Sequence, residues 1–337
     1  MLDLDIFSHS FKLFERGICQ KFVFHAGKED YFFKKNYASL NQKEVPAHIV
    51  EVLCSRILKE VGCTNYVKYD IARYCKSWGC VSKSYRNLET EKEIDLVDMM
   101  VKNRFDVAKE KMGLFHIDKE LSLVIQDQIH NEINIGDQAY LFSIENIIEQ
   151  IETYCNNYDY TFDKEKLFFH FMEMAISDYF FLNSDRNWRN ISLILNEKDE
   201  IRLVPIFDNG MSFALKTYPN VPRAEEIYLG ISDIGTKLEF REHGILKENG
   251  LIVADILQLT ENNKSLKQYV NKFLSLDIEQ FIENFKLQEN IDIKEDLEKR
   301  IIDLFTQRQQ HFNMVKNKIE KRIKNSTNEQ NVDLESV

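Results

Sequence analysis

The pattern of apolar and polar positions makes the beginning of the chain rich in predicted strands. Residues 17–36 predict two strands joined by a turn at 26–28, because short apolar runs flank a glycine. Residues 44–62 place apolar side chains three and four positions apart, the spacing of an amphipathic helix, and end at a glycine. Alternating patterns at 66–72 and 79–85 predict further strands.

After residue 86 helical spacing dominates. The clearest case is 163–182, where a broad stripe of large apolar residues predicts a buried helix. Two short apolar runs within 191–207 surround a polar turn at 196–200 and predict a hairpin. The other helices are predicted at 94–112, 117–130, 143–156 and across most of 253–325.

This order predicts an α+β protein with two lobes. The small lobe, residues 1–85, is β-rich with one helix. The large lobe, residues 86–324, is mainly helical and carries the hairpin. The polar end, residues 325–337, has too few apolar residues to add to a core and is predicted to be a disordered tail.

Composition narrows the classes of partner and compartment. The net charge of −11 argues against a general nucleic-acid binder, because non-specific affinity comes from Lys and Arg neutralising phosphates. The six Cys form no CxxC pair and no zinc spacing, which favours reduced, buried thiols in a reducing compartment. The acidic N-terminus lacks signal-peptide features, and no apolar run reaches the roughly 18–20 residues of a membrane span. We therefore expect a cytoplasmic protein with no membrane span; signal-less secretion into a host stays open.

The segment 183–210 carries the most specific chemistry. A polar loop follows the buried helix, and in it Asp185 precedes Asn190 by five residues; the hairpin then leads to an Asp-Asn-Gly turn at Asp208. Phosphoryl transfer needs oxygen ligands that hold Mg²⁺ against the phosphates and a carboxylate facing the acceptor hydroxyl. Each motif alone is more often an ordinary turn. Standing at both ends of one hairpin, they predict Asp185 as the catalytic residue, with Asn190 and Asp208 as metal ligands.

A site for ATP also needs a cation for the phosphates and a group that positions this cation. Lys34 ends an apolar strand, as the phosphate-binding lysine of kinases does. Glu51, in the middle of the following helix, is the expected carboxylate partner, and Glu44 at its start is the competitor. The alternative is that these are surface side chains. Gly17 is the one glycine available for a phosphate-covering loop, a weak indication because G-x-G-x-x-G is absent.

These residues resemble the HipA-like serine/threonine kinases, most of all the short members of the CtkA type. The matching blocks are the loop 183–190 (NSDRNWRN) and the segment 205–210 (PIFDNG). The helix 51–62 resembles the family's E-x-x-C helix, which favours Glu51 over Glu44, and 79–85 resembles its hinge strand.

The resemblance implies a two-lobed protein-kinase-like fold, ATP, Mg²⁺ and phosphorylation of protein Ser/Thr residues, including autophosphorylation. It implies that the hinge backbone contacts adenine. A HipB-like antitoxin partner stays open, because the extra N-terminal subdomain of full-length HipA proteins has no room here. The residues expected at the nucleotide are Gly17, Lys34, Glu51, Ser82, Lys83, Ser84, Asn187, Asn190 and Asp208.

Two other functions remain open from the sequence. A kinase acting on a lipid, sugar or antibiotic is one, since phosphoinositide kinases share a similar catalytic loop. A pseudokinase that binds nucleotide without catalysis is the other, because the glycine loop is poor. Within the leading hypothesis the protein substrate is unknown, and Ser212, Thr217 and Tyr218 are candidate phosphorylation sites just after the Asp-Asn-Gly motif.

Overall fold

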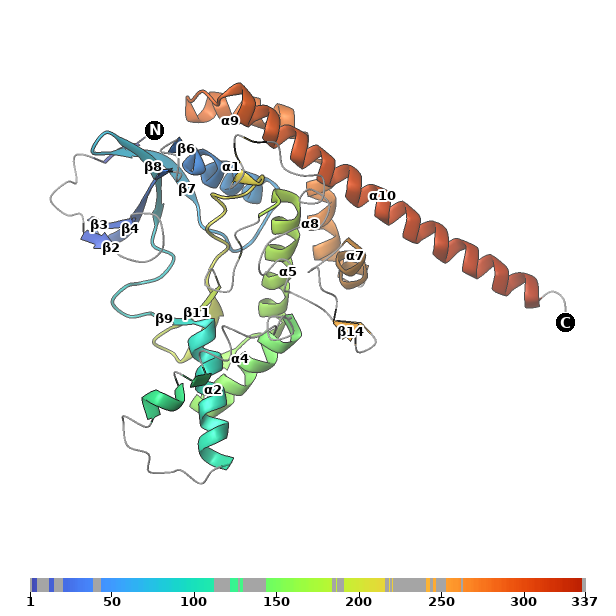
Figure 1. Ribbon diagram of the computed structural model, residues 1–337, viewed down its shortest axis with the longest axis horizontal. Coiled ribbons are helices and arrows are strands. Elements are labelled where there is room, and N and C mark those ends of the chain that lie inside the picture. Colours follow the sequence, from blue (N-terminus) through green and yellow to red (C-terminus); the bar gives the residue numbers. More distant parts are fainter. Residues whose placement is uncertain are drawn as a thin grey trace.

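The fold is seen in a computed structural model (Figure 1). It describes residues 2–4, 12–14, 21–38, 44–111, 122–126, 128–129, 144–183, 186, 191–215, 218, 220, 241–242, 245–246, 253–261 and 263–334.

A six-stranded sheet forms the amino-terminal part, with the strand order β1-β7-β8-β4-β3-β2. β1 runs parallel to β7, and the other neighbours are antiparallel. The turn predicted at 26–28 joins β3 to β4, and Gly27 there has a φ of +67°, which glycine adopts without strain. The strands are β1 (Leu2–Asp3), β2 (Lys12–Phe14), β3 (Lys21–Ala26), β4 (Glu29–Lys35), β7 (Tyr69–Tyr74) and β8 (Ser77–Lys83). A separate pair is β5 (Tyr37–Ala38) with β6 (Glu44–Val45).

The alternation of β4 gives the sheet two different faces. Phe33 is fully buried and packs with Phe24 and Val81 in a small apolar cluster on one face. Lys34, the next residue, points to the other face because successive strand side chains alternate. That face is covered by α1 (Ala47–Glu60), the helix predicted at 44–62, which packs on β7 and β8.

A second sheet and the helices α2, α4 and α5 lie in the middle of the described chain. Its order is β10-β12-β11-β9, and β11 and β12 are the predicted hairpin. The helix predicted from residue 94 begins only at Leu96, because residues 92–95 form β9, which pairs with β11. The elements are β9 (Lys92–Asp95), α2 (Leu96–Lys111), α4 (Ile144–Tyr158), β10 (Thr161–Phe162), α5 (Lys164–Phe181), β11 (Ser192–Leu195) and β12 (Glu200–Leu203).

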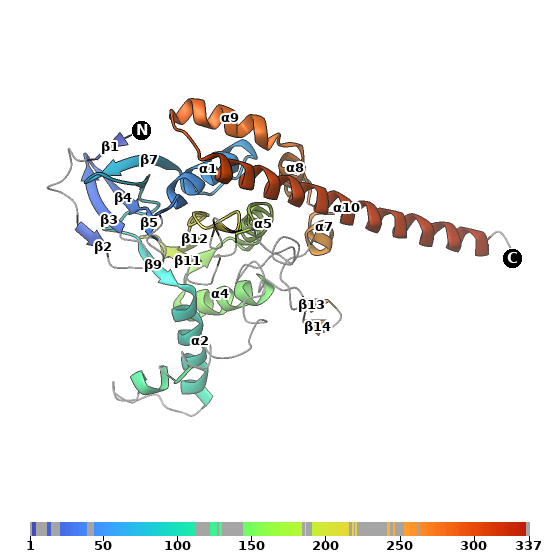
Figure 2. The ribbon, with the colours of Figure 1, turned by 45° about the horizontal axis from the view of Figure 1, so that its top comes forward.

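The carboxyl-terminal part is mostly helical, and α9 and the beginning of α10 lie near α1 in both views (Figures 1 and 2). α10 continues to Leu334, so the chain is helical beyond residue 324, where the sequence predicted a disordered tail. Residues 291–337 contain no Gly or Pro, and an established helix extends at little cost. The elements are β13 (Arg241–Glu242), β14 (Ile245–Leu246), α7 (Val253–Glu261), α8 (Lys264–Ser275), α9 (Ile278–Glu289) and α10 (Glu295–Leu334).

The fold class predicted from the sequence is confirmed: a β-sheet part with one helix precedes a mostly helical part. The lobe boundary at 85/86 stays a prediction. Within the described ranges, none of the helices has the length and apolar character to cross a membrane.

Candidate active site

Lys34, Glu51 and Asp208 meet in space, although 174 residues separate Lys34 from Asp208. Lys34 Nζ lies 2.9 Å from Glu51 Oε2 and also contacts Asp208 Oδ1. The Glu51 side chain is completely buried, whereas the Lys34 and Asp208 side chains keep 15% and 22% of their surface exposed. The ammonium therefore lies between two carboxylates, one in the interior and one open to a ligand.

The opposite charges of this cluster each favour the ionised form of the neighbouring group. Burial opposes the charged form of Lys34, but Asp208 and Glu51 outweigh it and raise the pKa of Lys34 well above its usual value. Burial alone would raise the pKa of Asp208, yet the ammonium groups of Lys34 and Lys21 lower it to about 2. Asp208 is therefore an ionised carboxylate at neutral pH, the state that a Mg²⁺ ligand requires.

The turn that carries Asp208 is held against α1. Glu51 uses its second oxygen, Oε1, to accept a hydrogen bond from the backbone N–H of Asn209 at 2.8 Å. A Cβ on Gly210 would lie 2.8 Å from Glu51 Oε2 and 3.2 Å from the carbonyl oxygen of Ala47. The glycine of the Asp-Asn-Gly motif is thus required by the close approach of α1.

Two residues of this region were not predicted from the sequence. Arg186 is fully buried and forms an ion pair with Asp178 in the last turn of α5, with Nε 2.9 Å from Oδ2. Burial raises the pKa of Asp178, and Arg186 opposes this shift. An Arg inside the matched loop was visible in the sequence, but nothing there indicated that it points inward.

Several predicted site residues lie outside the described part of the chain: Gly17, Asp185, Asn187 and Asn190. Their neighbours Asn183 and Arg186 are described, and both side chains donate to Asn209 Oδ1, at 3.2 and 2.9 Å. Asn183 and Arg186 are therefore both anchored to the turn that carries Asp208.

The predicted hinge residues lie at the end of β8. Ser82 is buried and pairs with Phe32 in β4. Lys83 is exposed and forms an ion pair with Glu29 at 2.7 Å. Ser84 donates its N–H to the carbonyl of Asp30 at 2.7 Å, so this amide already has a partner in the sheet.

The candidate phosphorylation sites differ in access. Ser212 is completely buried, so its hydroxyl is not accessible in this structure. Thr217 lies outside the described residues. Tyr218 donates its hydroxyl to Asp296 of α10 at 2.7 Å.

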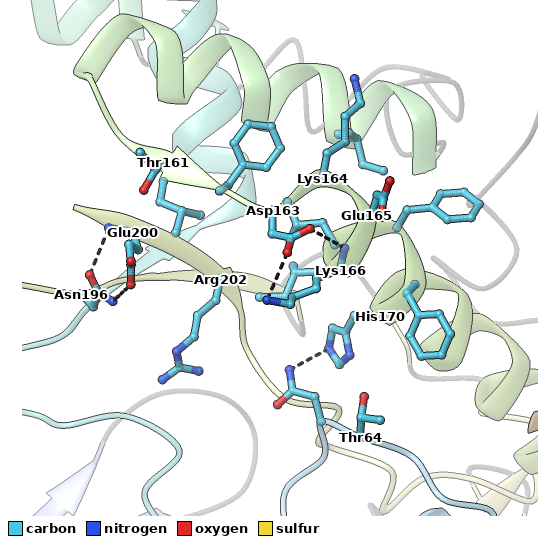
Figure 3. Close-up of a pocket in the computed structure, with 18 of the residues that line it drawn as sticks. Thr64, Thr161, Asp163, Lys164, Glu165, Lys166, His170, Asn196, Glu200 and Arg202 are labelled. Carbon is cyan, nitrogen blue, oxygen red and sulfur yellow. Dashed lines mark hydrogen bonds and ion pairs between the residues drawn. The ribbon is translucent and has the colours of Figure 1, made fainter. Parts of the chain in front are cut away.

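A large hollow of about 1260 Å³ lies away from this cluster, between α4, β12 and the start of α5 (Figure 3). Among its polar side chains, Lys166 pairs with Asp163 at 3.1 Å, and Glu200 accepts a hydrogen bond from Asn196 at 2.8 Å. It contains none of Lys34, Glu51 and Asp208, and we base the site on the chemistry of the cluster rather than on the size of the hollow.

Comparisons with known proteins give a fold rather than a sequence family. No protein-family model and no curated protein matches the chain. The structure of the Helicobacter pylori proinflammatory kinase CtkA is similar, with a TM-score of 0.55 and 14% identity over 93% of this chain and 95% of that one. The Shewanella oneidensis HipA chain, solved with HipB and operator DNA, matches with a TM-score of 0.44 and 14% identity over 90% of this chain and 65% of that one. The chain has the fold of CtkA. The resemblance to CtkA-type HipA-like kinases is thereby confirmed at the level of the fold.

Proposed function

We propose that this chain is an ATP- and Mg²⁺-dependent serine/threonine protein kinase of the HipA-like type, which transfers the γ-phosphoryl group to a protein hydroxyl and also phosphorylates itself. The observation that carries the proposal is the cluster of Lys34, Glu51 and Asp208, drawn from three separate elements. Kinases require a lysine held by a helix glutamate and an acidic metal ligand beside it. The fold shared with CtkA supports the same proposal.

The residues present fit ATP and Mg²⁺. Asp208 offers an ionised, partly exposed carboxylate, and Lys34 offers an ammonium whose direction is fixed by buried Glu51. When bound, Mg²⁺ would neutralise charge on the phosphates. Asp208 and Asn190 would hold the metal, Lys34 would bind phosphate oxygens, and Asp185 would accept the proton of the attacking hydroxyl. Ser82, Lys83 and Ser84 would lie at adenine, with Gly17 and Asn187 near the phosphates.

Incubation with Mg²⁺ and γ-labelled ATP, followed by phosphosite mapping, tests this function. We expect label on Ser or Thr of the chain itself or of an added protein. Asp208→Asn and Asp185→Asn should each reduce incorporation by about 100-fold or more, since the first removes a proposed metal ligand and the second the group proposed to accept the proton of the attacking hydroxyl. The matched control is Asp303→Asn, which changes an exposed aspartate of α10 and should label as wild type does.

Equal labelling of wild type and Asp208→Asn would contradict the metal assignment. Nucleotide binding without any labelled product, in wild type and variants alike, would instead support a pseudokinase. Label appearing only on an added lipid or sugar would favour the small-molecule kinase.

A further inference from the structure

The guanidinium of Arg186 joins three segments at the centre of the candidate site. It donates to both oxygens of Asp178, at 2.9 and 3.1 Å, and so is tied to α5. It also donates to Asn209 Oδ1 at 2.9 Å and to the carbonyl oxygen of Phe207 at 2.6 Å. Arg186 itself stands in the polar loop next to Asp185. A single buried side chain therefore connects the loop, the helix before it and the turn around Asp208.

Asp178 is poorly placed for the stability of α5 alone. It lies in the last turn, where the helix dipole disfavours an anion, and only 4% of it is exposed. Burying a carboxylate is costly unless it is paired and hydrogen-bonded. Arg186 and Asn183, which donates to Asp178 Oδ1 at 3.0 Å, provide these partners. The location of Asp178 is therefore explained by its contacts with Arg186 and Asn183, which it anchors to the end of α5.

The turn at Asp208 needs an anchor because its backbone is strained. Asp208 has a φ of +61°, in the left-handed region that non-glycine residues seldom adopt. The two peptide groups beside it are each fixed by a buried charged side chain. Arg186 holds the carbonyl of the preceding peptide, and Glu51 holds the N–H of the following one. Such strain persists where the surroundings determine the conformation.

We propose that Arg186 is a positioning residue, which holds Asp208 in its left-handed conformation so that its carboxylate faces Lys34 and the metal. This inference rests on the proposed function for its catalytic consequence, but its structural part can be tested alone. Loss of Arg186 releases the carbonyl of Phe207, so that of the two peptide groups beside Asp208 only the one held by Glu51 stays fixed.

The test compares Arg186→Gln with Arg308→Gln. Arg308 is a matched control, because it is also almost fully buried and donates to a backbone carbonyl, that of Tyr179 at 2.7 Å, outside the Asp208 turn. Arg186→Gln leaves Asp178 as an unpaired buried charge and can fail to fold. The double variant Arg186→Gln/Asp178→Asn removes both charges and keeps the experiment informative.

Two readouts separate the inference from the proposed function. Hydrogen–deuterium exchange of residues 205–213 should become faster in the Arg186 variants and stay as in wild type in Arg308→Gln. In phosphoryl transfer, kcat should fall by about 100-fold, as expected for a misplaced catalytic group. The Mg²⁺ concentration for half-maximal rate should rise, while ATP binding without Mg²⁺ should not change.

Unchanged exchange in both Arg186 variants would overturn the inference, whether or not the chain transfers phosphate. An equal rise in Mg²⁺ requirement in Arg308→Gln would also overturn it, because the effect would then be general destabilisation. Faster exchange in the Arg186 variants of a chain that transfers no phosphate would support the positioning role and count against the proposed function alone.

Discussion

Gly210 is a single residue whose lack of a side chain shapes the site. An added Cβ would lie 2.8 Å from Glu51 Oε2, the oxygen that also contacts Lys34. We predict that Gly210→Ala displaces Glu51 from Lys34 and lowers kcat by about 10- to 100-fold, the cost of a displacement near 1 Å or less. Steady-state labelling at saturating ATP measures this. Gly210→Val should lower kcat further than Gly210→Ala does. A kcat equal to that of wild type in both variants would contradict the prediction, because α1 would then move to make room for the side chain.

Asp208 should also make the stability of the protein depend on acid pH. Its pKa is lowered from 3.8 to about 2 because the nearby Lys34 and Lys21 outweigh burial. A lowered pKa contributes stability that is present above the unfolded value and is lost as pH falls through the folded one. The contribution is on the order of 2 kcal/mol and should disappear between about pH 4 and pH 2. Urea unfolding of wild type and Asp208→Asn across this range measures it, and parallel pH curves would contradict the prediction.

At the scale of single residues, the sequence predicted three of the residues for which we propose a chemical role. Lys34, Glu51 and Asp208 were predicted because phosphoryl transfer calls for a cation, its carboxylate partner and a metal ligand, and the structure brings the three together. Arg186 and Asp178 were not predicted, because the sequence does not distinguish an Arg–Asp pair that will be buried from one that will be exposed. Only the fold shows that Arg186 has no exposed surface.

Among the elements, α1 and α9 are joined in a way that should support the site. Arg56 of α1 donates to Glu289 at the end of α9, from Nε at 2.9 Å and Nη2 at 2.6 Å. Both side chains are mostly buried, at 17% and 13% exposed. α1 also carries Glu51, so α9 helps to hold the helix whose glutamate contacts Lys34.

We predict that Glu289→Gln lowers the free energy of unfolding by about 1–3 kcal/mol, the usual cost of weakening a hydrogen bond to a charged group. Urea unfolding measures this loss, and a double-mutant cycle with Arg56→Gln isolates the pair. Glu279→Gln, an exposed glutamate of the same helix, is the control and should change stability by less than about 0.5 kcal/mol. Additive effects in the cycle would mean that the two side chains do not act as a pair.

Helices and strands were predicted correctly where the residue pattern within one segment is enough to specify its structure. α5 was predicted to within one residue at each end, and the hairpin of β11 and β12 was predicted although β12 ends at Leu203 rather than near 207, because a broad apolar stripe and a polar turn are local patterns. β9 was missed because its four residues, Lys92–Asp95, become a strand only by pairing with β11, about 100 residues later. No local pattern records that pairing.

For the molecule as a whole, similarity to known proteins is visible in the fold but hardly in the sequence. The chain matches the CtkA fold over 93% of its length with 14% identity, and no family model recognises it. The order of a strand-rich part before a helical part predicted an α+β protein, and the resemblance of the loop 183–190 and the segment 205–210 to HipA-like kinases predicted the kinase-like fold. The packing of α9 near α1 could not be predicted, because it depends on contacts between distant segments such as Arg56 and Glu289 (Figure 2).

The far end of α10 should contribute little to the stability of the whole. Phe312 is fully buried against Tyr179 and Phe180, whereas none of residues 313–321 is buried. Figure 1 shows α10 continuing away from the other elements. We predict that a chain ending at Lys321 keeps the unfolding free energy of wild type within about 0.5 kcal/mol, while Phe312→Ala loses about 3–5 kcal/mol. Urea unfolding compares the two. A loss above about 2 kcal/mol on truncation would mean that residues 322–337 contribute to the stability of the folded protein.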